Sequence, residues 1–403
     1  MKRAGTILRG VLLCILVLLT GVYITIQLPV IQIQLSRQLS NYLSNELKTE
    51  VNIGRIQFNL FNKLSLRELT LKDRQGDTLA HIGELQLFTS DFFFLHDSIS
   101  IDKIELSNTQ IYLYRTDGIW RHQFLLDYFS SGTSTKKSKT PSRFKLHLKE
   151  AIAQNFVFHQ TDEWNGQRIK GQLDKLELNA NQLNLSDDKI DIKKLALTNP
   201  SIRLVSFSPK RKMAEEKAAN AESPWQLDGK KISINSFQII NGFIKIDQNS
   251  LTRKSGFDPS HMEIANLQAS LSNSLMSGDT LQSDLEIAAK EKSGFQLKKL
   301  KGVFLLSPKQ LSIKKFLLET PYSRLQESIQ LSFSKLSDLT QFSKKVTITS
   351  DFNNSIIGTQ DLSFFIPAAA HWKSAVRAGG LLQGKLNDLA IQQLSIGIGS
   401  GTN

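Results

Sequence analysis

The residues that could carry chemistry are scattered along this 403-residue chain rather than gathered into a motif. None of the seven histidines stands at metal-ligand spacing beside a carboxylate or the single cysteine. The sequence has no Gly-x-Ser-x-Gly elbow for a nucleophilic serine and no phosphate-cradling glycine loop. Carboxylates such as Asp102, Glu105, Asp191 and Glu286 alternate with apolar residues, so we expect them to face solvent. The sequence does not mark any two of them as the catalytic pair of a glycosidase. We therefore expect no catalytic residue, no metal, no cofactor and no enzymatic activity.

A recurring apolar phrase is the feature that any function must explain. It first reads Ile-Ser-Ile-Asp-Lys-Ile-Glu-Leu over residues 99–106, and its pattern returns at residues 146–153, 190–197, 232–239 and 311–318. The starts lie 47, 44, 42 and 79 residues apart, the last interval being about two steps of 40. Periods of this size indicate a repeat architecture, in which each unit must stack on its neighbours to bury its apolar face.

A second, shorter apolar alternation begins twelve residues after the phrase, at Ile111, Ile202 and Ile244. Alternation with period two indicates strands with one apolar and one polar face, so we expect each unit to be a pair of strands. At three to four strands per repeat, the chain would hold roughly 25 to 30 strands. The predicted fold class is mainly β: a transmembrane helix and an amphipathic helix, then an elongated, curved, solenoid-like sheet.

The apolar face of this sheet is the candidate functional site. After residue 50 the sequence has almost no long helical pattern to cover it. The face must therefore pack against a second sheet, form a closed core with a curled continuation of the same sheet, or bind a hydrophobic ligand such as acyl chains. The candidate groove-lining residues are Ile99, Ile101, Ile104, Leu106, Ile190, Ile192, Leu195, Leu197, Ile232, Ile234, Phe237 and Ile239.

The N-terminus has the pattern of a membrane anchor. Residues 1–9 form a basic flank, and residues 10–28 form an uncharged apolar stretch nearly long enough to cross ~30 Å of hydrocarbon. The alternative is a cleaved signal peptide, but no small-x-small cleavage site follows. Positive charge before the span predicts a cytoplasmic N-terminus in the inner membrane, with the bulk of the chain in the periplasm. The single cysteine lies inside the span, so no intrachain disulfide is possible.

The sequence then divides into an amphipathic helix and several blocks of repeats. Residues 29–49 place leucines at helical spacing, which favours a cap on the open end of a sheet over a helix on the bilayer, because the polar face has few basic residues. Two stretches interrupt the pattern: a Ser/Thr/Lys-rich flexible loop and a charged insertion, each expected to be solvated. The repeats occupy residues 50–129, 144–209 and 225–403, and the interruptions are residues 130–143 and 210–224.

The charge balance favours anionic partners. The net charge is +13, with 50 basic against 37 acidic residues, and it stays at +10 without the three basic residues of the N-terminal flank. For an anchored envelope protein these partners are lipid head groups rather than nucleic acid, and no DNA- or RNA-reading motif is present.

At this point the chain shows a resemblance to a known family. The anchor ending in Leu28-Pro29, the amphipathic helix, the segment 51–56 and the segment 64–73 are similar to the start of AsmA/TamB-type envelope proteins. The phrase at 99–106 strengthens the resemblance, which is closest to the N-terminal part of a large TamB-type translocation and assembly module protein. It implies inner-membrane anchoring, a periplasmic β-taco with an apolar groove, and movement of phospholipid toward the outer membrane.

The resemblance implies a second role as well. TamB-type proteins also serve outer-membrane protein assembly with a barrel partner, which they contact through a C-terminal domain that is not recognisable in this sequence. The alternative function is therefore a scaffold whose sheet edge receives client strands. We expect the chain to be part of a longer protein, with phospholipids, the inner membrane and an outer-membrane barrel as partners.

Overall fold

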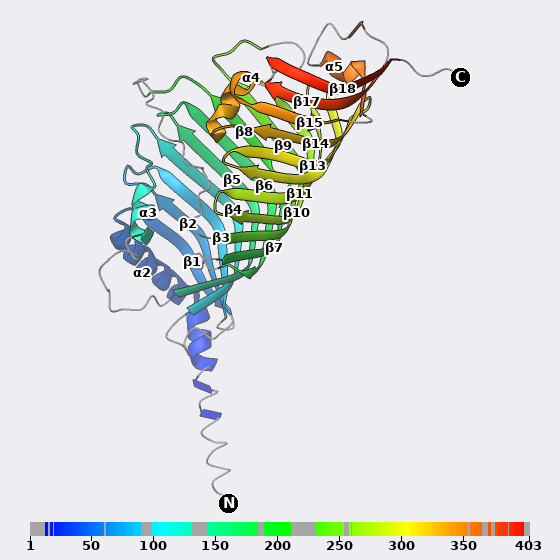
Figure 1. The fold of residues 1–403 in the computed structure, drawn as a ribbon. Helices are drawn as coiled ribbons and strands as arrows, with labels where there is room; N and C mark the ends of the chain where they lie inside the picture. Colours follow the sequence, from blue (N-terminus) through cyan, green and yellow to red (C-terminus); the bar gives the residue numbers. More distant parts are fainter. Residues whose placement is uncertain are drawn as a thin grey trace, which may run out of the picture. The chain divides into compact units, whose positions relative to one another are not determined.

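The chain is mainly β, as the alternation predicts (Figure 1). The computed structural model describes residues 13–14, 17–18, 20–59, 62–89, 99–130, 144–183, 189–210, 231–253, 258, 260–352, 355–364, 370–371, 375–385 and 387–398. The predicted basic flank, residues 10–12, 15–16 and 19 of the predicted anchor, nearly all of the loop 130–143 and nearly all of the insertion 210–224 lie outside these residues. Within them, no helix is both long enough and apolar enough to cross a membrane.

The chain divides into two compact units, residues 1–114 with 119–146 and residues 115–118 with 147–403. In the first unit, four strands form an antiparallel meander in which each strand pairs with the next. A helix covers the first strand and a short helix follows the last. These elements are α2 (Pro29–Leu47), β1 (Val51–Asn59), β2 (Lys63–Lys72), β3 (Thr78–Thr89), β4 (Ile99–Arg115) and α3 (Gln123–Ser130).

The second unit consists of strands β5 to β18 with three short helices. Its elements are β5 (Phe144–Asp162), β6 (Gln167–Gln182), β7 (Lys189–Thr198), β8 (Ser201–Ser206), β9 (Lys231–Gln248), β10 (Glu263–Ser277), β11 (Thr280–Glu291), β12 (Gln296–Ser307), β13 (Gln310–Glu319), β14 (Arg324–Ser332), η1 (Leu336–Gln341), α4 (Phe342–Lys345), β15 (Thr347–Asp351), β16 (Ser355–Ile357), α5 (Thr359–Ser363), β17 (Val376–Lys385) and β18 (Asp388–Ile398).

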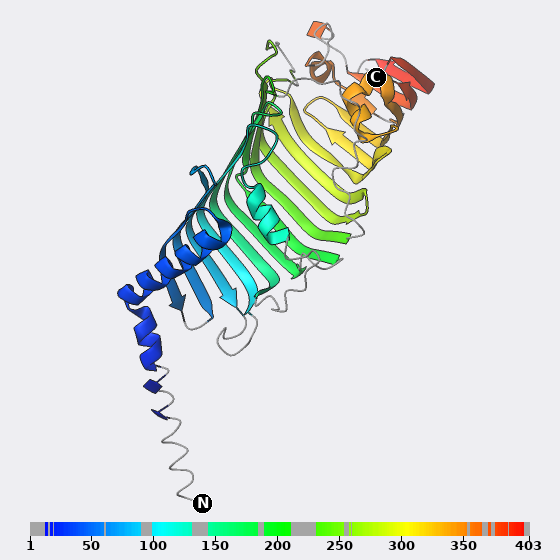
Figure 2. The same ribbon diagram turned by 90° about the vertical axis from the view of Figure 1, so that its left-hand side faces the viewer.

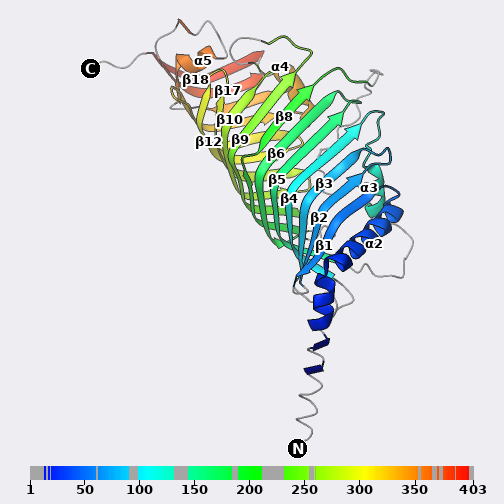
Figure 3. The same cartoon turned by 180° about the vertical axis from the view of Figure 1, so that it is seen from behind.

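The sheet of the second unit is mixed. Strand β6 pairs antiparallel with β5 on one side and with both β7 and β8 on the other, since β7 and β8 follow each other along one line. Both β7 and β8 pair in parallel with β9. From β9 to β14 each strand pairs antiparallel with the next, and β15 and β16 together link β14 to β17, which pairs with β18. Figures 2 and 3 show these strands side by side, curving along their length.

Two copies of the repeat phrase stack on each other in register. The parallel pairing of β7 and β8 with β9 runs from Lys189 opposite Lys231 to Ser206 opposite Gln248. The offset is 231 − 189 = 42 residues throughout, which equals the period read from the sequence. Equivalent residues of the two copies are therefore direct neighbours in the sheet.

The predicted pair of strands per unit is found in the copies that begin at residues 190 and 311, which form β7 with β8 and β13 with β14. In the other three copies the chain bends without ending the strand, so the pair is one continuous strand. Asn108, Asn155, Asn199 and Asn241 each follow a copy of the phrase and have positive φ of 50° to 56°. Asparagine tolerates this left-handed conformation, so β4, β5 and β9 continue through it. Strands of up to 19 residues result, and the described residues form eighteen of them rather than 25 to 30.

Two of these asparagines, Asn199 and Asn241, are joined by their side chains. The Asn241 amide nitrogen donates to the Asn199 carbonyl oxygen at 2.8 Å, and the Asn199 amide nitrogen donates to the Asp174 carboxylate at 2.6 Å. This short ladder joins β6, the β7–β8 junction and β9 at the position where the strands bend. The bend is therefore placed at the same level in these neighbouring strands.

Candidate functional site

The buried titratable residues of the described chain hold turns together. Asp73 accepts backbone N–H bonds from Gln75 and Asp77 at 2.8 and 2.9 Å in the turn between β2 and β3. Asp162 has the same role after β5, where it accepts the N–H of Asn165 at 3.1 Å. Both carboxylates therefore stabilise the turn that follows their strand.

Ion pairs complete the Asp162 turn. The Arg115 guanidinium donates two hydrogen bonds to the Asp162 carboxylate, one of them from Nε at 2.9 Å. Burial alone would raise the pKa of Asp162, but the hydrogen bonds from Arg115 and Asn165 outweigh it and lower the pKa. The carboxylate is thus held in its charged form as a structural group.

Two further acids repeat this arrangement in the second unit. Asp258 accepts the N–H of Ser260 at 3.0 Å and contacts His261 Nδ1 at 2.9 Å, while Glu291 accepts the N–H of Ser293 at 2.6 Å. Across the described residues, His, Cys, Asp and Glu side chains do not gather in threes at a place where they could hold a metal ion. These titratable groups therefore stabilise turns of the fold. The apolar face of the sheet remains as the candidate functional site.

One row of apolar side chains crosses nine strands of the second unit, and we call it row 1. Residues directly opposite each other in a sheet project from the same face. Every member of row 1 is the direct register partner of the next, so all of them share one face. Row 1 consists of Ala153, Leu176, Leu197, Ile239, Ala269, Ile287, Leu300, Leu318 and Leu325.

Two more rows run beside row 1 on the same face. Leu176 and Leu178 lie two residues apart in β6, so row 2, which contains Leu178, projects from the same side as row 1. Row 2 consists of Ala151, Leu178, Leu195, Phe237, Leu271 and Leu285. Row 3 consists of Ile190, Ile232, Met276, Leu281, Leu306, Leu311, Leu331 and Ile348. Together the three rows form what we call the apolar face, and none of their members is charged.

A β-bulge explains why the phrase keeps its apolar residues on one face. Ile192 and Leu195 are three residues apart and would project from opposite sides of a regular strand. Their partners in β6, Ala180 and Leu178, are only two residues apart, so β7 contains one extra residue at this point. The same shift occurs in β4, between Ile101 and Ile104. The spacing of the phrase is that of a strand with one bulge, which simple alternation does not reveal.

The candidate groove residues fall into two sets. The eight in β7 and β9 are paired as Ile190 with Ile232, Ile192 with Ile234, Leu195 with Phe237, and Leu197 with Ile239. The others lie in β4 of the first unit, where Ile101, Ile104 and Leu106 pair with Thr89, Leu87 and Leu85. Ile99 begins β4, and its side chain lies outside the described residues.

Most of the apolar face is half-buried, which is unusual for a protein core. Ile190 of row 3 and the neighbouring Ile192 are 9 and 8% exposed, and Leu285 of row 2 is 8% exposed. The other members of rows 1 and 2 from β6 onward keep accessible surface. A face sealed under a second packed sheet would bury them all. These side chains pack against their ladder neighbours and keep part of their surface accessible.

The opposite face of the sheet carries the charges. Lys175 and Lys194 both pair with Glu177, and Lys299 pairs with Glu286 at 3.2 Å. Hydrogen bonds from these lysines, that from Lys175 first, lower the pKa of Glu177 against the effect of burial. The sheet therefore separates a polar, ion-paired face from an apolar one, as the alternation predicts.

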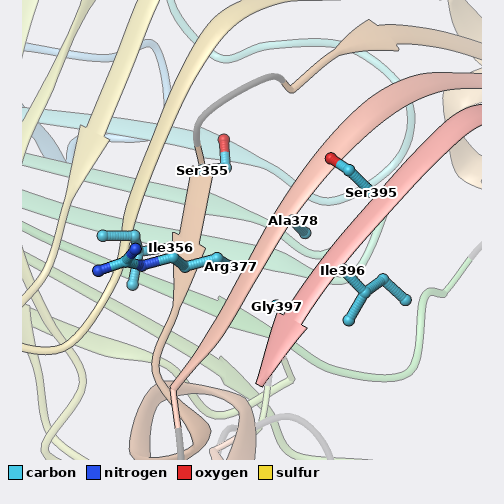
Figure 4. A pocket seen from close by; sticks show the side chains of 7 residues that line it. All are labelled: Ser355, Ile356, Arg377, Ala378, Ser395, Ile396 and Gly397. Atoms are coloured by element: carbon cyan, nitrogen blue, oxygen red, sulfur yellow. The ribbon is translucent and has the colours of Figure 1, made fainter. Parts of the chain in front are cut away.

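A hollow of about 440 Å³ lies between β16, β17 and β18 (Figure 4). Ser355, Ala378 and Ile396 are register partners on one face, while Ile356, Arg377 and Gly397 are partners in the next row. Figure 4 shows the Arg377 side chain directed away from Ser355 and Ser395. The polar groups do not converge, so the hollow lacks the geometry of an active site.

The candidate groove residues do not include the part of the apolar face that lies in β6, β10, β11, β12 and β14, although Leu325 of β14 continues the second apolar alternation weakly. These strands lack the full phrase, but short alternations such as Leu176-Glu-Leu178 and Leu267-Gln-Ala269-Ser-Leu271 are present and indicate the facing side. No protein-family model matches the chain, and comparison with curated proteins finds no match.

Proposed function

We propose that this chain carries phospholipid acyl chains along its apolar face, as a single-pass inner-membrane protein whose bulk lies in the periplasm and which delivers lipid toward the outer membrane. The observation that carries the proposal is the continuity of row 1 across nine strands with accessible hydrocarbon along it. An acyl chain needs such a surface and no polar site chemistry. The basic net charge suits the anionic head groups.

The length of row 1 favours a path over a single binding pocket. Nine strands have eight spacings of ~4.8 Å, which gives roughly 38 Å. The acyl chains of one leaflet span about half of the ~30 Å hydrocarbon core of a bilayer. Row 1 is therefore long enough for more than two acyl chains placed end to end, as transfer along a conduit requires.

Two adjacent residues of β9 provide a matched test. Ile239 belongs to row 1, and Ile240 follows it on the opposite face with 43% of its surface exposed. A photoreactive amino acid at Ile239 should crosslink to phospholipid in cells, and the same residue at Ile240 should give little lipid adduct, as measured by mass spectrometry. Equal labelling at the two positions, or none at Ile239, would refute lipid carriage along this face.

The second candidate function is a scaffold for outer-membrane β-barrel assembly, and one observation favours it. Among the described strands β18 pairs with β17 alone, and its Leu389, Ile391 and Leu394 are 36, 46 and 50% exposed. An edge strand of this kind can receive another strand by β-augmentation. Crosslinks from the β18 backbone edge to unfolded barrel proteins, without lipid at Ile239, would favour this second function.

A further inference from the structure

Helix α2 contacts the edge of the first strand through serine side chains. The Ser40 hydroxyl accepts the N–H of Ile53 at 2.9 Å in a buried position, and the Ser44 hydroxyl accepts the N–H of Val51 at 2.9 Å. Ser44 also donates to the carbonyl oxygen of Val51 at 3.2 Å. Among the described strands β1 pairs with β2, so these bonds satisfy backbone groups on its other edge.

The leucines of α2 cover the apolar side of the same strands. Leu35, Leu39 and Leu43 pack against a cluster formed by Ile53, Ile56 and Leu66. Figure 3 shows α2 lying beside β1. The helix therefore contacts both the edge and the face of the sheet, which agrees with the cap that the sequence favours over a helix on the bilayer.

In the first unit, the apolar side chains of β1 and β2 beside α2 are more deeply buried than those of β3 and β4. One ladder row runs from Ile56 in β1 through Leu66 in β2 and Leu85 in β3 to Leu106 in β4. Ile56 and Leu66 are 4 and 7% exposed, whereas Leu85 and Leu106 are half-buried like rows 1 and 2. The accessible part of this row therefore begins at β3.

We infer that α2 is a built-in closure of the first end of the sheet, held on the β1 edge by Ser40 and Ser44, and that apolar cargo gains access beside it, over β3 and β4. The access point rests on the proposed function; the closure does not. Because the serines take the place of a neighbouring strand, the closure also prevents strand addition at this edge. Client strands would have to bind elsewhere on the sheet.

Cysteine accessibility in the full chain tests the closure without any lipid assay. Cys14 is the single cysteine, so Cys14→Ser provides a background for Leu66→Cys and Leu85→Cys. N-ethylmaleimide should modify Leu66→Cys at least about tenfold more slowly than Leu85→Cys, because modification of the covered position requires local opening. Equal rates at the two positions would overturn the closure.

The role of the serines needs its own variants. Ser40→Ala with Ser44→Ala removes both acceptors, and the rate at Leu66→Cys should rise about tenfold toward the rate at Leu85→Cys, since unpaired edge groups favour opening. Ser36→Ala is the matched control: Ser36 is 1% exposed, but its hydroxyl donates to Ile33 within α2. If the modification rate at Leu66→Cys is unchanged in the double variant, or rises equally in the control, Ser40 and Ser44 do not hold α2 on the β1 edge.

A lipid readout separates the closure from the proposed function. Vesicles containing phosphatidylethanolamine with a photoactivatable acyl chain should label peptides with Leu85 or Leu106, and not the peptide with Leu66. Labelling at Ile239 without labelling at Leu85 and Leu106 would place access elsewhere and overturn the inference. Slow modification of Leu66→Cys with no lipid label anywhere would leave the closure standing and refute lipid carriage.

Discussion

A pair of aspartates in row 1 should block lipid passage while leaving the protein folded. Leu197 and Ile239 are direct partners in β7 and β9, and both are half-buried. Full burial of such a side chain stabilises by ~1.5–3 kcal/mol, so the partial burial of these two side chains is worth roughly 2–5 kcal/mol in total. A carboxylate at either position can remain hydrated through the accessible side of the face, so no large desolvation cost is added.

The same change in a buried pair sets the scale for comparison. Ile190 and Ile192 lie in the same strand as Leu197 and are 9 and 8% exposed. Two aspartates there lose roughly 3–6 kcal/mol of apolar burial, and each carboxylate costs several kcal/mol more to desolvate. That total approaches the stability of a whole domain, about 5–15 kcal/mol, so this double variant should fail to accumulate.

Three measurements decide the outcome. Steady-state protein level and resistance to limited proteolysis report folding, and phospholipid that copurifies with the protein, measured by mass spectrometry, reports cargo. Leu197→Asp with Ile239→Asp should accumulate normally and lose at least about tenfold of its bound lipid, since two charges cross the path. Thr198→Asp with Ile240→Asp, on the opposite face of the same two strands, should keep both properties.

Two outcomes would refute this reasoning. If the row 1 pair unfolds as completely as Ile190→Asp with Ile192→Asp, the face is a sealed core and the conduit is excluded. If the row 1 pair keeps its lipid, the cargo does not follow row 1.

Three further predictions concern stability. Burial lowers the pKa of His122, so the unfolded chain binds a proton more readily than the folded chain does. The stability that neutral His122 contributes should be present above about pH 6.5 and lost as the pH falls. The His122→Phe variant should therefore show a smaller change in melting temperature between pH 8 and pH 5 than the unchanged protein. Asp162→Asn leaves Arg115 without its charged partner and should cost roughly 3 kcal/mol; an unchanged urea midpoint would contradict a structural role for the pair. Asn241→Ala should destabilise by about 1 kcal/mol more than Asn241→Gly, because glycine adopts positive φ without steric cost, and equal thermal melts would rule out backbone strain as the reason for asparagine.

The repeat could be predicted because its signal is local and periodic. The phrase in β7 and in β9 carries its apolar residues at the same intervals, and the 42-residue step leads directly to the pairing of Ile190 with Ile232. The number of strands could not be predicted, because asparagine after a strand usually indicates a turn. Asn199 lies between β7 and β8 whereas Asn241 lies inside β9, although a side-chain hydrogen bond joins the two, so the residue type does not reveal whether a strand ends.

The closure by α2 was only half visible in the sequence. Its leucine stripe predicts a face that packs on a sheet, and Leu35, Leu39 and Leu43 do so. The role of Ser40 and Ser44 was not predictable, since serine on a helix is ordinarily a surface residue. Only the position of the β1 edge turns these hydroxyls into acceptors for strand N–H groups.

The distribution of polar contacts explains how an accessible apolar face is compatible with a stable sheet. A protein that leaves part of its apolar face accessible gives up part of the burial that stabilises an ordinary core. Here the turns are fixed instead by buried acids, Asp73, Asp162 and Asp258, each accepting backbone N–H groups. Ion pairs such as those of Glu177 lie on the opposite face, away from rows 1 to 3. Because the groups that hold the fold are separated from the apolar face, the hydrophobic ligand that we propose would bind and leave that face without rearranging the contacts that keep the strands in place.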